Sequence, residues 1–135
     1  MSVDLTGRPR STGLRTRWPA RRLAAAIVVA PLMLALLVAT SGGWGPAAPP
    51  AWLVLVSLTA LATAMTVATY VPLPGTGRRL EVGCMPCAVV APLSVLVSVG
   101  LVGSAARDVP SATLAVGVAA FGLLQRLTNV SSCAA

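Results

Sequence analysis

No charged side chain occurs between Arg22 and Arg78. The surface of a water-soluble domain is built largely from polar and charged residues, and a neutral run of this length cannot supply such a surface. The whole chain follows the same trend, since 56% of its 135 residues are hydrophobic, 10% are charged and the mean hydropathy is +0.87. We therefore expect the chain to fold in lipid, as an integral membrane protein.

Four apolar segments lie at about residues 23–40, 51–71, 86–106 and 109–125. Each is close to the ~20 residues that a helix needs to cross a hydrocarbon core of about 30 Å. Turn-rich connections separate them, so we predict an all-α integral membrane protein with four transmembrane helices in an antiparallel bundle with short loops. This domain covers residues 23–127, between a disordered basic tail over 1–22 and a short tail over 128–135.

The first segment allows a second interpretation. Basic residues precede it, and the small residues Ala39, Thr40 and Ser41 follow its apolar stretch, as in a cleavable signal peptide. Because the rest of the chain is itself strongly apolar, we favour an uncleaved helix. Pro31 in the middle of the segment removes one backbone hydrogen bond and predicts a kink.

The distribution of arginines predicts the orientation. Six lie in residues 1–22, two follow the second segment and one ends the fourth, whereas Arg107 alone lies between the third and fourth. The positive-inside rule then places both termini in the cytoplasm. The chain has no lysine and is rich in Ala, Val, Leu and Arg, which is typical of a high-GC bacterium, so we predict a multi-pass protein of the bacterial inner membrane.

The net charge of +7 does not indicate a nucleic-acid partner, because the arginines flank apolar segments instead of forming one basic face with aromatic residues between them. The expected partners are the lipid bilayer and either further copies of the chain or a larger membrane complex. A stripe of small residues favours such contacts, because it lets a second helix approach closely. It consists of Ala60, Ala64 and Ala68, with Thr59, Thr63 and Thr66 beside it as candidate interhelical hydrogen-bond donors.

Several single residues mark the ends of the segments. Trp44 and Trp52 are predicted at the headgroup level of the bilayer, as tryptophans commonly are. Asp108 or Ser111 is expected to cap the start of the fourth helix. Arg126 is expected to mark the exit of that helix, where a cation stabilises the negative helix end, so that no ionisable residue lies inside a span.

The one motif with chemically reactive side chains is formed by Cys84, Met85, Pro86 and Cys87. Two thiols at this spacing on a first helical turn share a face, and a helix N-terminus lowers the pKa of a thiol. These four residues resemble a thioredoxin-type active site. A four-helix membrane protein with a Cys-x-x-Cys also resembles the membrane thiol oxidoreductases of the vitamin K epoxide reductase and disulfide-bond B kinds, although their pair faces the oxidising side. The resemblance implies that Cys84 attacks a disulfide, that Cys87 resolves it and that Cys133 relays electrons.

Metal binding is the alternative chemistry for the thiols, and a purely structural role without chemistry is the interpretation that we favour over both. Cys84, Cys87 and Cys133 could hold a soft metal such as Cu(I), but a closed zinc or iron–sulfur site usually takes four ligands, and the chain has three cysteines and no histidine. Cysteine is also a common small apolar residue without chemistry. No cofactor is required by the sequence.

The leading functional hypothesis is therefore a small non-enzymatic accessory or interaction protein of the membrane. Without histidine or a glycine-rich phosphate loop, the sequence offers no catalytic arrangement besides the cysteines, and it leaves the question of an enzyme open. A membrane thiol-disulfide protein is the first alternative and a soft-metal binder or carrier is the second.

Overall fold

The computed structural model describes residues 18–45, 48–72, 87–105 and 107–129. These residues form four helices and no strand, which confirms the expected all-helical chain within the described part. The helices are α2 (Ala20–Thr40), α3 (Pro50–Ala68), α4 (Cys87–Ser104) and α5 (Val109–Asn129). Three of them, α2, α3 and α5, are long and apolar enough to cross a membrane, whereas the apolar part of α4, Val89–Ser104, is shorter.

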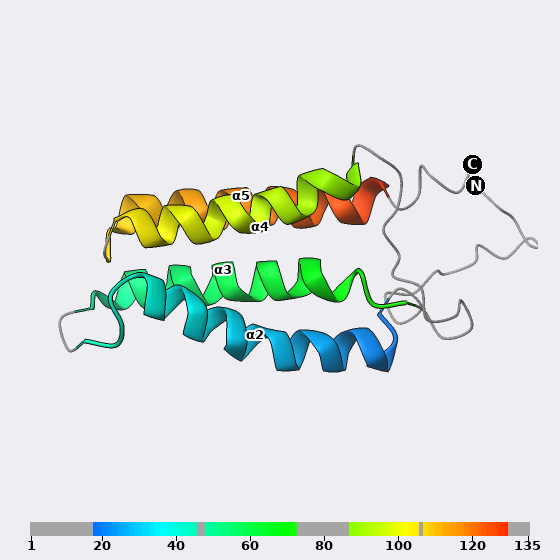
Figure 1. Ribbon diagram of the computed structural model, residues 1–135, viewed down its shortest axis with the longest axis horizontal. Helices are drawn as coiled ribbons and strands as arrows, with labels where there is room; N and C mark the ends of the chain where they lie inside the picture. Colours follow the sequence, from blue (N-terminus) through cyan, green and yellow to red (C-terminus); the bar gives the residue numbers. More distant parts are fainter. Residues whose placement is uncertain (1–17, 46–47, 73–86, 106, 130–135) are drawn as a thin grey trace, which may run out of the picture.

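The helices form two pairs that lie side by side (Figure 1). α2 packs against α3, α4 packs against α5, and the two pairs meet mainly where α3 packs against α5. α3 thus lies between α2 and α5, and no direct contact joins α2 to α5 among the described residues. α2 and α4 begin at the end of the molecule where α3 and α5 finish (Figure 1). We name the two ends of the molecule after an arginine at each: the Arg126 end, where α2 and α4 begin, and the Arg107 end, where they finish.

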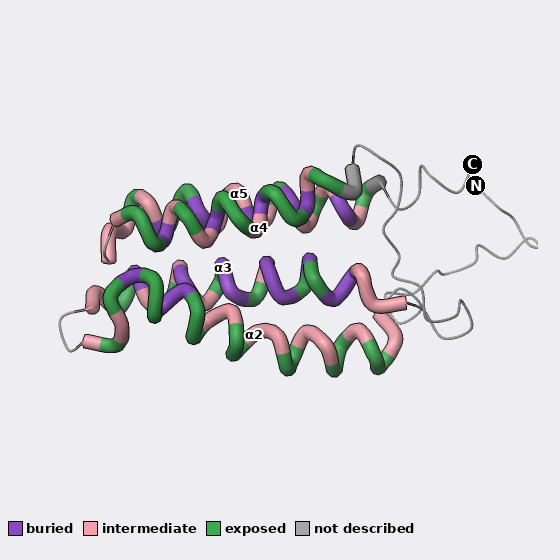
Figure 2. Tube along the Cα trace, viewed as in Figure 1, coloured by how far each residue is buried: buried purple, intermediate pink, exposed green. Residues whose placement is uncertain are grey.

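Small and hydroxyl-bearing side chains fill much of the interior, while large apolar side chains cover the outside. Figure 2 shows buried positions running along the side of α3 that faces the other helices. Near the Arg107 end the core includes Leu37, Trp52 and Val102, but elsewhere it consists mainly of alanine, serine and threonine. The exposed large apolar residues are Leu23, Ile27, Val28, Leu32 and Leu36 on α2, Val54, Leu58, Leu61, Met65 and Val67 on α3, Val89, Leu93, Leu96 and Val97 on α4, and Leu114, Phe121 and Leu124 on α5.

The contact between α4 and α5 depends on residues with little or no side chain. A Cβ atom added to Gly122 would lie 2.7 Å from the Cβ atom of Ser94, so a larger residue does not fit there. One turn further along, the Ser98 hydroxyl lies 2.7 Å from the Ser94 carbonyl of its own helix and 3.2 Å from the Ala115 carbonyl of α5. Close backbone approach and one interhelical hydrogen bond therefore join this pair.

The predicted stripe on α3 is buried, but its threonines do not bond to other helices. Thr59, Thr63 and Thr66 donate to the carbonyls of Leu55, Thr59 and Ala62, each one turn earlier on the same helix. A threonine hydroxyl reaches the carbonyl four residues back without moving the helix, so it needs no partner from elsewhere. The prediction that these three threonines donate hydrogen bonds to other helices was therefore wrong for the bonds described here.

Prolines and a capping residue define how the helices run and start. α2 continues through Pro31, and Figure 1 shows it bending along its length. α4 begins at Cys87, so Pro92 lies inside the helix and does not start it. Asp108 caps α5, since its carboxylate accepts hydrogen bonds from the backbone N–H of Ser111 at 2.9 Å and from the Ser111 hydroxyl at 2.8 Å. Of the two predicted capping residues, Asp108 is therefore the one used.

The two tryptophans near the start of α3 occupy opposite environments. Trp44 is 72% exposed in the connection between α2 and α3, which agrees with an interfacial position. Trp52 is 1% exposed and belongs to the core cluster with Leu37 and Val56. The prediction that both lie at the headgroup level concerns their depth in a bilayer and stays a prediction. The structure shows that Trp52, in the first turn of α3, faces the other helices.

Candidate functional site

The cysteine motif lies almost wholly outside the described residues. Cys84 and Cys133 fall outside them, and Cys87 is described only as the first residue of α4. The predicted redox and metal sites therefore stay predictions. Within the described ranges no three or more His, Cys, Asp or Glu residues come together as a metal site would need.

The described residue with the most unusual environment is Arg126. The sequence predicted that Arg126 marks the exit of its helix, and Arg126 does lie in the last turn of α5, which ends at Asn129. Its side chain is nevertheless only 5% exposed. Arg126 is also near the end of Val109–Thr128, a helix that is long and apolar enough to cross a membrane.

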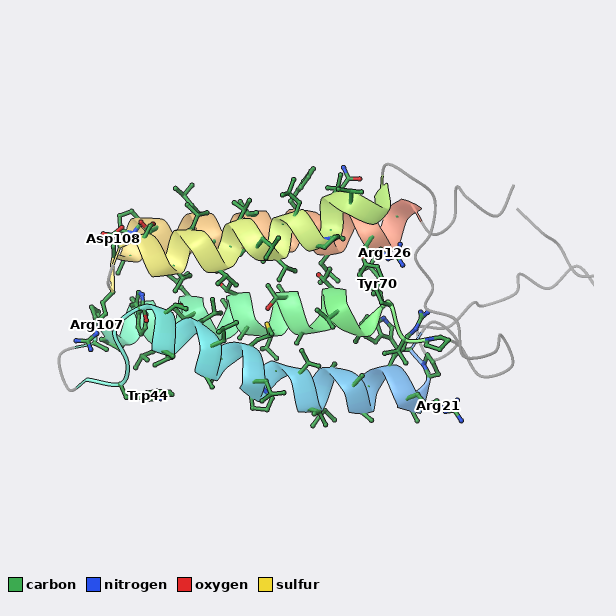
Figure 3. The ribbon with its side chains drawn as sticks, in the orientation of Figure 1. Arg21, Trp44, Tyr70, Arg107, Asp108 and Arg126 are labelled. Carbon is green, nitrogen blue, oxygen red and sulfur yellow. The ribbon has the colours of Figure 1, made fainter. Side chains whose placement is uncertain are left out.

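The guanidinium of Arg126 contacts the C-terminal turn of α3. Its Nε donates a hydrogen bond to the Thr69 hydroxyl at 3.3 Å, and its Cζ lies 4.4 Å from the centre of the Tyr70 ring. Figure 3 shows Arg126 and Tyr70 next to each other at this end of the molecule. The Thr69 hydroxyl in turn donates to the Thr66 carbonyl at 2.6 Å, so it accepts from one side and donates to the other.

A second arginine reaches the same turn from α2. The Nε of Arg22, in the first turn of α2, donates to the Val71 carbonyl at 2.9 Å. The end of a helix leaves carbonyls without intrahelical partners and carries about half a negative charge. Arg22 and Arg126 thus bring two cations from the two helices flanking α3 to residues 69–71, where the partial charge of α3 is negative.

Burying a cation is costly unless hydrogen bonds and charge compensate for the lost water. The described interactions that compensate for the burial of Arg126 include the Thr69 hydroxyl, the face of the Tyr70 ring and the negative end of α3. A cation over an aromatic ring contributes more when it is desolvated than at an exposed site, about 2 kcal/mol or more. These contacts hold Arg126 in a fixed position against the end of α3. We therefore take the Arg126 end, with Arg22, Thr69, Tyr70 and Arg126, as our candidate functional site.

Arg107 joins the two helix pairs at the other end. A terminal nitrogen of its guanidinium donates to the Gly43 carbonyl at 3.2 Å, across from the α4–α5 turn to the α2–α3 connection. A Cβ atom added to Gly45 would lie 2.9 Å from the Arg107 Cζ, so the guanidinium occupies the space of a side chain there. Arg107 itself has a φ of 61°, a left-handed conformation that is uncommon for a residue other than glycine. The contact of Arg107 with Gly43 and Gly45 holds the two helix pairs together at this end, and we call it the clamp.

Sequence reasoning missed both arginine contacts. The sequence does not distinguish an arginine at the end of an apolar segment whose side chain points toward water from one whose side chain points into the bundle. One signal was present, since Tyr70 and Arg126 each end an apolar segment on the same predicted side of the membrane, where a ring and a cation could meet.

The described part of the chain is thus an all-helical protein with three helices able to span a membrane and two arginines held at one end of the central helix. Comparisons with models of protein families, with curated proteins and with solved structures give no match.

Proposed function

We propose that the chain is a four-span bundle of the bacterial inner membrane that acts as a non-enzymatic accessory or interaction protein. The observation that carries the membrane part is the distribution of side chains between interior and surface. Serine, threonine and alanine are buried, while large aliphatic residues on all four helices are exposed. In water this arrangement would leave a large apolar surface uncovered, whereas in a bilayer the lipid chains cover it.

The shorter helix α4 serves as the fourth span in this proposal. It is paired with α5 along an interface of small residues, and its other side carries Leu93, Leu96 and Val97 exposed. α4 as a whole has 18 residues against 19 in α3, so its length is close to the ~20 residues that a span needs. α2 starts and α5 finishes at the Arg126 end (Figure 1), which supports a topology with both termini on one side, and the arginine distribution favours the cytoplasm as that side.

The interaction part of the proposal rests on the outer face of α4. Most small-residue positions on α3, α4 and α5 are used inside the bundle. Two glycines are exceptions, Gly100 on α4 and Gly117 on α5: both are exposed, and a Cβ atom added at either would meet no atom within 4 Å. Exposed Phe121 follows Gly117 by four residues, so only Gly100 has a small exposed neighbour one turn on. Ser104, four residues later, is also exposed and completes a small-residue pair that allows close approach of another helix. We infer that this face serves self-association or contact with a larger membrane complex.

Membrane insertion and orientation are tested with the full chain in bacterial membranes. The protein should stay in the membrane pellet after alkaline carbonate washing. Reporter fusions after residues 45 and 107 should be active only for a periplasmic reporter, and fusions after residues 79 and 135 only for a cytoplasmic one. Release by carbonate, or the opposite reporter pattern, would contradict the insertion or the orientation respectively.

Self-association is tested by light scattering of the detergent-solubilised protein. Gly100→Ile should reduce the mass of the complex to that of one chain, because a branched side chain prevents close helix contact. Gly117→Ile is the matched control, since Gly117 on α5 is also exposed with open space around it. Equal effects of the two substitutions, or none, would count against the α4 face.

One observation favours a second candidate function, the thiol-disulfide protein. α4 begins at Cys87, and this start lies at the same end of the molecule as Arg22 and Arg126 (Figure 1). Helix N-termini and nearby cations both favour the thiolate form of cysteine. Counting reactive thiols by mass-tag alkylation before and after reduction tests it: a disulfide between Cys84 and Cys87 supports redox chemistry, and three free thiols oppose it.

A further inference from the structure

We propose that two copies of the chain associate in parallel through α4, and that their α4 helices cross at Gly100 and Ser104, near the Arg107 end. This inference rests on the proposed function, because it names the partner of the α4 face as a second copy in the same orientation. It also states where along the helix the contact lies.

The first argument is the side of α4 that faces away from the bundle. Ala91, Ser98 and Val102 are buried and share one side of the helix, since they are seven and four residues apart. The opposite side carries exposed residues at intervals of three or four: Val89, Leu93, Leu96, Val97, Gly100 and Ser104. These residues stay exposed although α2, α3 and α5 all contact α4. A further helix can therefore lie against this side.

The second argument is the change in side-chain size along this face. Its four large residues lie toward the Arg126 end, whereas Gly100 and Ser104 lie nearest the Arg107 end. A Cβ atom added to Gly100 would meet no atom within 4 Å, so the backbone of another helix can come close there. Helices that cross on small residues diverge by about 40°, so the two α4 axes would be roughly 13 Å further apart at Val89 than at the crossing. This divergence gives the larger side chains the space that they need.

The third argument is the distribution of charge in the proposed topology, in which all copies have the same orientation. The cytoplasmic side carries nine of the ten arginines and two of the three acidic residues, Asp4 and Glu81, so its net charge is +7. The other side carries only Arg107 and Asp108, whose charges cancel. Two parallel copies therefore repel each other on the cytoplasmic side and not at the Arg107 end. Charge and side-chain size thus place the contact at the same end of α4.

The fourth argument is that the turn after α4 suits a two-fold interface. In such an interface every contact occurs twice with the partners exchanged, so the contacting surface must be complementary to itself. A turn with Arg107 and Asp108 meets this condition, because the cation of one copy would lie near the carboxylate of the other. Both described hydrogen bonds of that carboxylate use Oδ2, which leaves Oδ1 to accept from the second copy.

Disulfide cross-linking of the full chain in bacterial membranes tests the geometry. The native thiols are first removed by Cys84→Ser, Cys87→Ser and Cys133→Ser. Ser104→Cys then adds one thiol on the α4 face, and we expect mild oxidation to convert this variant to a covalent dimer. Thr113→Cys is the matched control, because Thr113 is also exposed and close to the α4–α5 turn but lies on α5. It should stay monomeric, and adding Gly100→Ile to Ser104→Cys should abolish the cross-link.

The identity of the partner is tested with the native cysteines in place. Two copies with different affinity tags, expressed together, should purify together in mild detergent, and Gly100→Ile should prevent this. Asp108→Asn removes the charge but keeps a side chain that caps α5. It should weaken the association about fivefold, the effect of losing two exposed ion pairs.

Equal cross-linking of Ser104→Cys and Thr113→Cys, or a cross-link of Ser104→Cys to a different protein alone, would overturn the proposal. Unchanged association of Asp108→Asn would overturn the pairing of Arg107 with Asp108. A protein that resists carbonate and loses mass in Gly100→Ile, but does not cross-link through Ser104→Cys, refutes this inference alone. Release by carbonate refutes the proposed function.

Discussion

Gly122 of α5 and Ser94 of α4 touch so closely that the Cβ atom of an alanine at position 122 would lie 2.7 Å from the Cβ atom of Ser94. The two helices approach here because one of them has no side chain. Their separation, and with it the position of Arg126 one turn further along α5, is set by this contact.

The first prediction concerns that contact. Gly122→Ala should destabilise the protein by about 1–3 kcal/mol, because an added methyl group must push two packed helices apart. Gly117→Ala on the same helix should leave stability unchanged or raise it slightly, since open space surrounds Gly117 and alanine favours a helix. Thermal midpoints in detergent measure both. Adding Ser94→Gly should restore most of the loss, and failure of this rescue would contradict a steric cause.

The second prediction concerns the cap of α5. Hydrogen bonds from the backbone N–H and the hydroxyl of Ser111 hold the pKa of Asp108 below its ordinary value. A carboxylate whose pKa is lower in the folded state stabilises the protein fully above its unfolded-state pKa, and this contribution is lost as the pH falls through the folded-state pKa. The wild-type thermal midpoint should therefore drop in acid more steeply than that of Asp108→Asn.

Asparagine is the appropriate comparison because it still caps a helix but does not titrate in this range. At neutral pH the Asp108→Asn variant should be nearly as stable as the wild type, whereas Asp108→Ala should be less stable at neutral pH and equally insensitive to acid. Parallel acid profiles for wild type and Asp108→Asn would contradict the role of the carboxylate.

The third prediction separates the two tryptophans. Aqueous iodide should quench the fluorescence of Trp44, which is 72% exposed, and should not reach Trp52, which is 1% exposed. Trp44→Phe should therefore remove most of the quenchable emission, while Trp52→Phe should leave it and remove the blue-shifted component. Half-buried Trp18 contributes equally in both variants. An equal loss of quenching in the two variants would contradict the burial of Trp52.

The fourth prediction tests the clamp at the Arg107 end. Gly45→Ala should cost about 1 kcal/mol, because the methyl group displaces the Arg107 guanidinium from the Gly43 carbonyl and one hydrogen bond is lost. The same substitution should have almost no effect in an Arg107→Ala background, where the guanidinium is already absent. Thermal midpoints of the wild type, Gly45→Ala, Arg107→Ala and the double variant measure the coupling between the two positions. Additive effects would show that Gly45 acts independently of Arg107.

The sequence predicted those parts of the structure that depend on composition along the chain. Long apolar segments predict helices because only a helix satisfies its own backbone in lipid, and the ends of the four helices agree with the four predicted segments to within four residues. The cap of α5 was also predictable, since Asp108 directly precedes the apolar run and a carboxylate bonds to N–H groups at a helix start.

The inward-facing contacts could not be predicted in the same way. Burial of Trp52 and Arg126 depends on how each helix is rotated about its axis, and α3 and α4 are apolar on every side, so hydropathy does not define a face. Nor does the spacing of the small residues say which of them are used internally. Ser94 and Ser98 face α5, whereas Gly100 and Ser104 do not. The cysteine site stays a prediction, because the described residues do not include its side chains.

The turn between α4 and α5 has a consequence for biogenesis in the proposed topology. Arg107 and Asp108 are adjacent, so the segment that must be translocated carries one charge of each sign and no net charge. The connection from α2 to α3 carries no charged residue at all. Both hairpins can therefore enter the bilayer without moving net charge across it. The bond from Arg107 to the Gly43 carbonyl can form only after both connections have crossed the bilayer, so this contact between the hairpins follows their insertion.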